Sequence, residues 1–349
     1  MKTSSIVPFE NSPALDGYHC QTNSLAKIFH YHNCPLSEDL LLGLGGGMGF
    51  IYWKMNFGKE IYVFVGGRGN NKNFFDDIGI RTGVKIKSIS TSSVKKAEQL
   101  LLQQVSQNQP VMLFGDMGYL PWFKLPEEYH FGGHTFVICG YDGKDTFLAS
   151  DLESQSAGLK KGFYHQITLE QLNKARNSPH KPFPPKNTSL DFDFTGFHPP
   201  TKEDIYSAIK QTVGELLEPP IKNLGVKGIR HTGKEILKWS KIFNQNELIM
   251  NLFNLYIFIE IGGTGGGCFR YMYARFLKEA SEITENRNLL NIAGQFHKSG
   301  ELFTEIALLF KDYENTEGLN ERISRASEVF DAIAGIEENA LVELSKECS

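Results

Sequence analysis

The sequence predicts an α+β protein in which a mixed N-terminal region is followed by an α-helical region. Three observations lead to this prediction. Short apolar or alternating runs, which are typical of strands, recur up to about residue 175. Six of the 14 prolines then fall within residues 177–200, which argues against a helix or a central strand there. Beyond residue 200, apolar residues recur at helical spacing.

The N-terminal region is predicted to begin with an amphipathic helix at residues 20–31. A second helix is predicted to start at Ser93 and to end before Asn108, and a third to start at Thr168. The runs that we interpret as strands lie at residues 61–65, 84–89, 111–114, 134–141, 146–150 and 163–168. These elements predict a first domain at residues 1–176.

The C-terminal region is predicted to form an α-helical domain at residues 201–349. Its first helix opens with Thr201 and Asp204 at the spacing of a capping box. Further helices are predicted at about residues 233–243, 246–261, 268–284, 287–311 and 318–345. The proline-rich residues 177–200 are interpreted as the linker between the two domains.

Charge and composition argue against several classes of protein. A net charge of −4 and a pI near 6.2 argue against nucleic acid as a partner. The longest apolar run, residues 248–261, is too short and too interrupted to span a membrane, and the N-terminal residues show no signal peptide. Five cysteines without close pairs predict no disulfide framework. We therefore expect a cytoplasmic protein, and the sequence leaves a homo-oligomer open.

Glycine clusters suggest nucleotide binding only at first sight. Those at residues 43–49, 65–70 and 261–269 do not match the dinucleotide fingerprint between a strand and a helix. Residues 228–235, GIRHTGKE, miss the P-loop pattern because Glu235 replaces the hydroxyl residue that would bind Mg²⁺. No cofactor is predicted.

The glycine run IGGTGGGCFR joins two helical stretches and has two interpretations. It can be a close-packed turn that only glycine permits. It can also be a substrate-binding loop, with Gly265, Gly266 and Gly267 offering N–H groups at a helix start and Arg270 offering charge. The residues alone favour the turn.

Cys20 is a candidate nucleophile because it lies at the start of a predicted helix, where the helix dipole lowers the pKa of a thiol. A catalytic thiol also needs a base and a group that orients the base. His134 begins a strong predicted strand, and the following DGKD sequence is typical of a hairpin turn.

The hairpin register selects the third residue. A turn centred on residues 143–144 places Phe136 opposite Asp151, so that Asp151 lies on the face of His134 and diagonal to it. Glu153 would be directly opposite His134 only if the strand extended that far. Cys139 points to the other face and is predicted to be core.

Other interpretations of Cys20 stay open at this point. Most lone cysteines are inert packing residues, and a histidine at a strand start is often only structural. Cys20, His30, His32 and Cys34 also form a possible zinc pattern, but its spacing is unusual for structural zinc. No metal site is predicted.

At these residues the sequence resembles a known family. The stretch HCQTNSLAKIFHYHNCPLSEDLLLGLGGGMGFIYW, the GGR at 66–68, HFGGHTFVICGYD and KPFPP are similar to the butirosin-biosynthesis protein H family. PPIKNLGVKGIR and IGGTGGGCFRYMYARFLKEA resemble the helical domain that accompanies it. The resemblance covers nearly the whole chain and implies a papain-like cysteine-peptidase fold for the N-terminal domain.

The resemblance implies cysteine-dependent acyl transfer. An acyl group would pass from the phosphopantetheine thioester of an acyl carrier protein to a small-molecule amine acceptor. Cys20 would match the nucleophile, His134 the base and Asp151 the orienting acid. The alternatives are an amidase or peptidase with the same triad, and a binding protein whose triad is vestigial.

The sequence departs from the related peptidases in one respect. They use a glutamine shortly before the nucleophile to stabilise the oxyanion, whereas residues 11–19 read NSPALDGYH. Asn11 is the one side-chain amide in this stretch and is our oxyanion candidate, together with the backbone N–H of Cys20.

Overall fold

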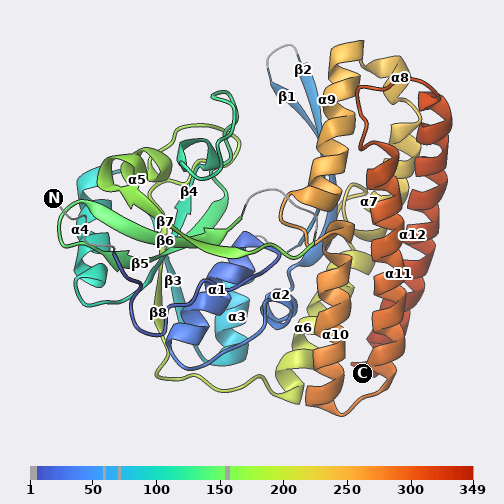
Figure 1. Cartoon of the computed structure of the whole chain (residues 1–349). Helices are drawn as coiled ribbons and strands as arrows, with labels where there is room; N and C mark the ends of the chain where they lie inside the picture. The colour runs from blue at the N-terminus through green and yellow to red at the C-terminus, as the bar shows by residue number, and fades with distance from the viewer. Residues whose placement is uncertain (1–5, 58–59, 70–71, 154–157, 349) are drawn as a thin grey trace. The chain divides into compact units, whose positions relative to one another are not determined.

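The computed structural model describes residues 6–57, 60–69, 72–153 and 158–348 of the chain. The chain divides into two compact units (Figure 1). The first unit comprises Met1–Leu41 and Thr82–Pro199, and the second comprises Leu42–Arg81 and Pro200–Ser349. This division departs from the predicted domains, because residues 42–81 group with the C-terminal helices rather than with the N-terminal region.

The first unit contains a six-stranded antiparallel sheet with the strand order β3-β8-β4-β5-β6-β7. Its strands are β3 (Lys85–Ile89), β4 (Val111–Gly115), β5 (His134–Tyr141), β6 (Thr146–Leu152), β7 (Gly162–Thr168) and β8 (Ser189–Asp193). Five of these six strands correspond to predicted runs.

The sixth strand, β8, corrects our interpretation of residues 177–200 as a linker. It lies between β3 and β4, and Leu190 pairs with both Ser88 and Met112. The six prolines of this segment cluster at its two ends, so residues 186–198 contain none and retain the N–H groups that a central strand needs.

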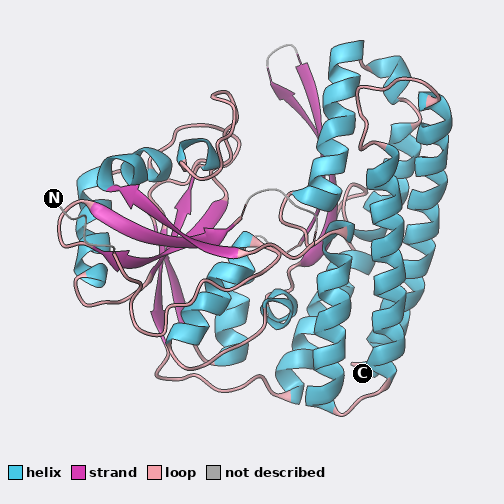
Figure 2. Cartoon of the chain, in the orientation of Figure 1, coloured by secondary structure: helices cyan, strands magenta, loops and turns pink. Residues whose placement is uncertain are grey.

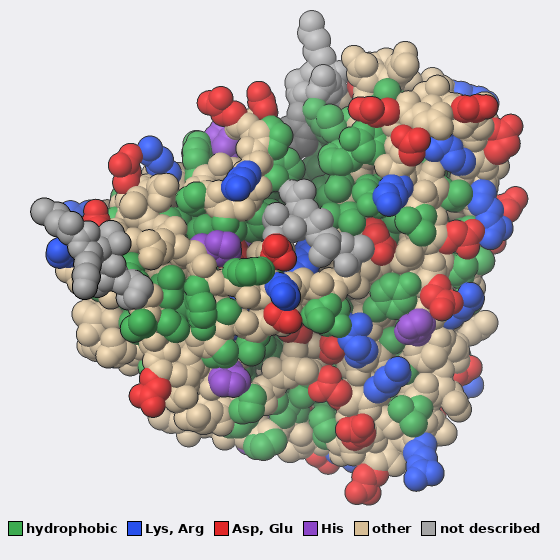
Figure 3. Space-filling view, viewed as in Figure 1, with side chains coloured by type: hydrophobic (Ala, Val, Ile, Leu, Met, Phe, Trp, Pro, Cys, Tyr) green, Lys and Arg blue, Asp and Glu red, His purple; other side chains and the backbone are tan. Residues whose placement is uncertain are grey.

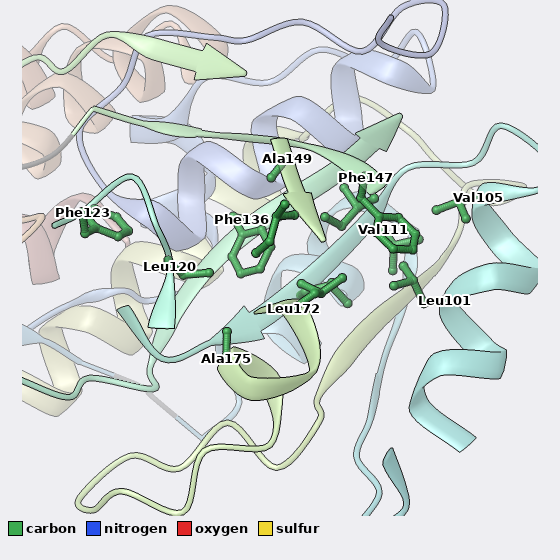
Figure 4. Packing of buried hydrophobic residues seen from close by; sticks show 13 residues of the cluster. Leu101, Val105, Val111, Leu120, Phe123, Phe136, Phe147, Ala149, Leu172 and Ala175 are labelled. Carbon is green, nitrogen blue, oxygen red and sulfur yellow. The ribbon is translucent and has the colours of Figure 1, made fainter. Parts of the chain in front are cut away.

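Three helices pack on the sheet of the first unit: α1 (Cys20–Tyr31), α4 (Val94–Val105) and α5 (Leu169–Arg176). Ser93 and Thr168 cap α4 and α5 as predicted. Leu101 of α4, Leu172 of α5 and Phe136 of β5 belong to one buried apolar cluster (Figure 4). Helix α1 packs against β4, β5 and β6 and is buried from Thr22 to Phe29.

The register of the β5–β6 hairpin is as predicted at the end that carries His134. Val137 pairs with Ser150 and Ile138 with Ala149, which is the predicted register. A β-bulge after Ile138 changes the register by one residue in the part of the hairpin nearer the turn, where Gly140 pairs with Leu148. The side chain of Cys139 at this bulge is buried, in agreement with the predicted core position.

The second unit is mainly helical (Figure 2). Its larger elements are β1 (Met48–Phe57), β2 (Glu60–Arg68), α3 (Phe74–Thr82), α6 (Lys202–Leu217), α7 (Gly225–Ile236), α8 (Trp239–Ile242), α9 (Gln245–Tyr256), α10 (Arg270–Thr284), α11 (Asn288–Leu309) and α12 (Leu319–Glu347). Thr201 and Asp204 form the predicted capping box of α6. Helix α2 (Glu38–Leu44) spans the boundary between the units.

Three elements of the chain's first half lie outside our predictions. These are α2, β1 and α3, which we either left unassigned or took as part of a glycine cluster. GIRHTGKE, the near P-loop, lies entirely within α7, so its backbone N–H groups are engaged in a helix rather than exposed in a phosphate-binding loop.

Acidic and basic side chains are interspersed on the visible surface of both units, as expected for a small net charge (Figure 3). Within the described ranges, no helix is both long enough and apolar enough to cross a membrane.

Candidate active site

Cys20 is the first residue of α1 and is half-buried. The N-cap of this helix is His19, whose ring Nδ1 accepts a hydrogen bond of 3.4 Å from the backbone N–H of Thr22. The histidine beside the thiol therefore has a structural position at the helix start.

The chain just before Cys20 is held by a buried carboxylate. Glu38 accepts hydrogen bonds from the backbone N–H groups of Tyr18 and His19 and from the side chains of Thr22 and Asn23. Burial raises the pKa of Glu38, although these four donors partly offset that effect. Glu38 thereby fixes the turn from which the thiol projects.

His134 and Asp151 are in direct contact. His134 is the first residue of β5, Asp151 lies near the end of β6, and His134 Nε2 lies 2.7 Å from Asp151 Oδ2. Both side chains are almost completely buried, at 7% and 2% exposure. Asp151 thus lies beside His134, as the hairpin register predicted.

Asp151 has further hydrogen-bond donors that hold it in place. Trp122 Nε1 donates to Oδ2 over 2.9 Å, and the N–H of Leu152 donates to Oδ1 over 2.7 Å. The ring of Phe123 meets the ring of His134 edge-on, with centroids 5.0 Å apart. The tip of the loop between β4 and β5 thus encloses the His134–Asp151 pair and shields it from water.

Cys20 and His134 shift each other's pKa. Burial raises the pKa of Cys20, but the interaction with His134 and its charge, with the N–H of Thr135, more than offset this effect and lower the pKa below its ordinary value. Burial likewise lowers the pKa of His134, whereas Asp151 and Cys20 raise it to about 10. Both shifts favour a thiolate–imidazolium ion pair over a neutral thiol and imidazole.

A buried lysine lies on the same helix. Lys27 is 3% exposed, and its Nζ has no hydrogen-bond partner in the described part of the chain. Burial lowers its pKa to about 8, although the negative charges of Asp151 and Glu38 partly offset this effect. Lys27 interacts electrostatically with the two buried carboxylates.

Asn11, the oxyanion candidate, is exposed in a turn with a φ of 59°. Over the described residues, no hydrogen bond joins its side chain to Cys20, His134 or Asp151. Its role in oxyanion stabilisation stays a prediction.

The predicted substrate loop belongs to the second unit. Arg270 is completely buried and forms two hydrogen bonds with Glu337, of 2.7 and 2.9 Å, and two more with the carbonyls of Gly49 and Cys268. The N–H of Gly267 donates to Glu260.

The neighbouring glycines also fit a turn that is stabilised within the loop itself. The N–H of Gly266 donates to the Thr264 hydroxyl, and Gly265 has a φ of 70°. These internal partners and the left-handed backbone support the close-packed turn, while the ligand-binding role stays a prediction.

The zinc interpretation of Cys20, His30, His32 and Cys34 fails on distance. Cys20 and His30 lie at opposite ends of α1, and ten residues of helix separate them by about 15 Å. Two ligands of one zinc ion must both lie about 2 Å from it. Over the ranges that the structure describes, no other group of His, Cys, Asp and Glu side chains is arranged to hold a metal.

Several residues of this site could not be found from the sequence. Every residue from Thr22 to Phe29 of α1 is buried, so periodicity could not single out Lys27. Glu38 belongs to a helix that we did not predict. Trp122 lies in the β4–β5 loop, and its contact with Asp151 depends on how that loop folds.

Comparison with known families finds two matches. The family described as butirosin biosynthesis protein H, N-terminal, matches residues 19–152, and a domain of unknown function (DUF4872) matches residues 170–344. The first match includes Cys20, His134 and Asp151, and the second includes Arg270. No curated protein matches the chain.

Proposed function

The chain belongs to the family of butirosin biosynthesis protein H, and on this premise we propose that it is a cysteine-dependent acyltransferase with a papain-like N-terminal domain. Family membership supports a role as an enzyme in secondary-metabolite biosynthesis of the butirosin type. The observation that carries the proposal is the buried contact of His134 with Asp151, together with the opposite pKa shifts of Cys20 and His134, which favour an ion pair.

In the first half-reaction, the Cys20 thiolate attacks the carbonyl carbon of an acyl thioester. A tetrahedral oxyanion forms and then collapses, the bond from the acyl carbon to the donor sulfur breaks, and the His134 imidazolium gives its proton to the departing thiol. The acyl group is then held on Cys20 as a new thioester, and His134 is neutral.

In the second half-reaction, an amine attacks the acyl-enzyme and neutral His134 takes the amine proton. The Cys20–acyl bond breaks, which releases an amide and restores the thiolate–imidazolium pair. Asp151 holds the His134 ring through Nε2, which leaves Nδ1 for the thiol side.

The donor and acceptor follow from the family rather than from the site. We propose that the donor is an acyl group on the phosphopantetheine arm of a carrier protein and that the acceptor is a small-molecule amine. With an amide as the donor and water as the acceptor, the same triad would act as an amidase or peptidase. With a thioester donor, transfer and hydrolysis differ only in the second half-reaction.

An acyl-thioester of N-acetylcysteamine tests both half-reactions. We expect mass spectrometry of the wild-type protein to find one acyl group on Cys20, and we expect added amines to increase the rate at which it disappears, with amide as the product. Cys34→Ser is the matched control and should behave as wild type. Release of free acid at a rate independent of amine would contradict transfer, and the absence of any acyl-enzyme would favour a vestigial triad.

A further inference from the structure

The chain that precedes Cys20 packs against the start of β7. Gly17 and Lys160 exchange two backbone hydrogen bonds of 2.8 and 2.7 Å, and the N–H of Gly162 donates to the side chain of Asp16. Antiparallel partners that exchange both hydrogen bonds have Cα atoms about 5.5 Å apart. Lys160 is thus fixed beside a residue only three positions before the nucleophile.

Two glycines make this close approach possible. A Cβ atom at Gly162 would collide with the backbone carbonyls of Ala14 and Leu15. A Cβ atom at Gly17 would collide with the carboxylate of Glu38, which holds the same turn. Residues 11–19, which precede the nucleophile, have Asn11 as their one side-chain amide, and residues 14–17 contain none.

Lys160 is half-buried and interacts electrostatically with Cys20, and more weakly with Asp151 and Glu38. Lys27 is placed differently, because it follows Cys20 by seven residues on α1 and is therefore about 10 Å further along the helix axis. The main charged partners of Lys27 are Asp151, Glu38 and Cys139.

Charge moves in a defined direction when the thiolate attacks a carbonyl. The negative charge leaves the sulfur and collects on the carbonyl oxygen, about two bonds away, while the His134 cation stays with the sulfur and the leaving group. A second cation near the thiol can stabilise the oxyanion without competing for that proton.

We propose that Lys160 is a catalytic residue that stabilises the oxyanion, together with the backbone N–H of Cys20, in place of the side-chain amide of the related peptidases. This inference rests on the proposed acyl chemistry at Cys20 and concerns both acylation and deacylation. It assigns no role to Asn11.

Two reactions of the same thiol separate stabilisation of the oxyanion from activation of the thiolate. Acylation by p-nitrophenyl acetate passes through an oxyanion, whereas alkylation by iodoacetamide does not. Lys160→Met is expected to slow acylation of Cys20 by about 100-fold, the usual effect of losing one oxyanion donor, and to change alkylation by less than about threefold. Lys160→Arg keeps the charge and is expected to lose less than about tenfold in acylation.

Lys161→Met is the matched control, because Lys161 is the exposed neighbour, and both of its rates should equal those of wild type. Lys160→Leu provides a second neutral variant under the same criterion if the methionine variant does not fold. Unchanged acylation in a folded neutral variant would overturn the inference, and so would an equal fall of both rates, since Lys160 would then act on the thiolate. Failure of wild-type acyl-enzyme to react with amines would instead refute transfer and leave the role of Lys160 intact.

Discussion

Cys20 and Cys268 are both cysteines at the start of a helix, yet their environments differ. Cys20 begins α1 and is half-buried, whereas Cys268 lies just before α10 and is completely buried. Burial raises the pKa of Cys268 to about 12, and Arg270 offsets this only in part, because Arg270 is paired with Glu337. The pKa of Cys20 is lowered instead.

The comparison shows that a helix start does not by itself activate a thiol. Cys20 has a partner, His134, that can hold or release a proton, and Cys268 lies beside a buried ion pair whose charges are already balanced. Cys20 is half-exposed and can react. The charges of Arg270 and Glu337, beside Cys268, instead balance each other in the interior of the second unit.

Alkylation of the two thiols should show the largest difference. A thiol with a pKa of about 12 has a thiolate fraction of about 10⁻⁵ at pH 7, so we expect iodoacetamide to modify Cys20 about 10⁴-fold faster than Cys268. Because its pKa is lowered, the reactivity of Cys20 should be lost only as the pH falls through that lowered value. Peptide mass spectrometry over time measures both rates, and equal rates would refute activation by His134.

Breaking the buried pair of the second unit should affect stability rather than chemistry. Glu337→Gln leaves the Arg270 charge uncompensated, and we expect it to lower the free energy of unfolding by about 4 kcal/mol. Glu338→Gln is the matched control, since its exposed pair with Arg230 contributes less than about 1 kcal/mol. Urea denaturation measures both. A Glu337→Gln protein of normal stability but without activity would instead support ligand binding by the glycine loop.

Asp151→Asn should lower the rate of acyl transfer without unfolding the protein. We expect acyl transfer to fall by about 100-fold, because His134 loses the charge that orients it and raises its pKa. The ion pair is lost as the pH rises through the pKa of His134, so the alkaline limb of the pH–rate profile should move from about 10 to lower pH. Asp145→Asn, in the hairpin turn, is the control. An unchanged alkaline limb would contradict the role of Asp151.

Trp122→Phe should have the smallest effect. It removes one hydrogen bond to Asp151 and keeps most of the aromatic packing, so we expect a fall in transfer rate of about fivefold, equivalent to about 1 kcal/mol. Trp53→Phe, an exposed tryptophan of the second unit, should have no effect. A loss as large as that of Asp151→Asn would mean that Trp122 also contacts substrate.

The parts of the fold that follow local rules could be predicted from the sequence. The bounds of α1, the caps of α5 and α6 and the register that brings His134 to Asp151 all depend on residues close together in the chain. The contact of Asp151 with Trp122 joins separate segments and leaves no periodic signal.

Elements that depend on distant partners were missed. Strand β8 forms because β3 and β4 offer unpaired edges, and strand β1 follows a glycine cluster that suggested only a loop. The roles of Glu38 and Lys27 depend on burial of charged side chains, which sequence patterns normally place at the surface.

The division of the chain has a practical consequence for anyone who wishes to isolate the reactive half. The polypeptide leaves the first unit at residue 41, returns at residue 82 and leaves it again at residue 199. A fragment truncated at residue 199 would therefore carry the β1–β2 hairpin without α7 and α9, the helices that cover it, and its apolar side chains would invite aggregation. Expressing the first unit alone therefore requires the removal of residues 42–81 as well as of the residues after 199, which simple C-terminal truncations cannot achieve.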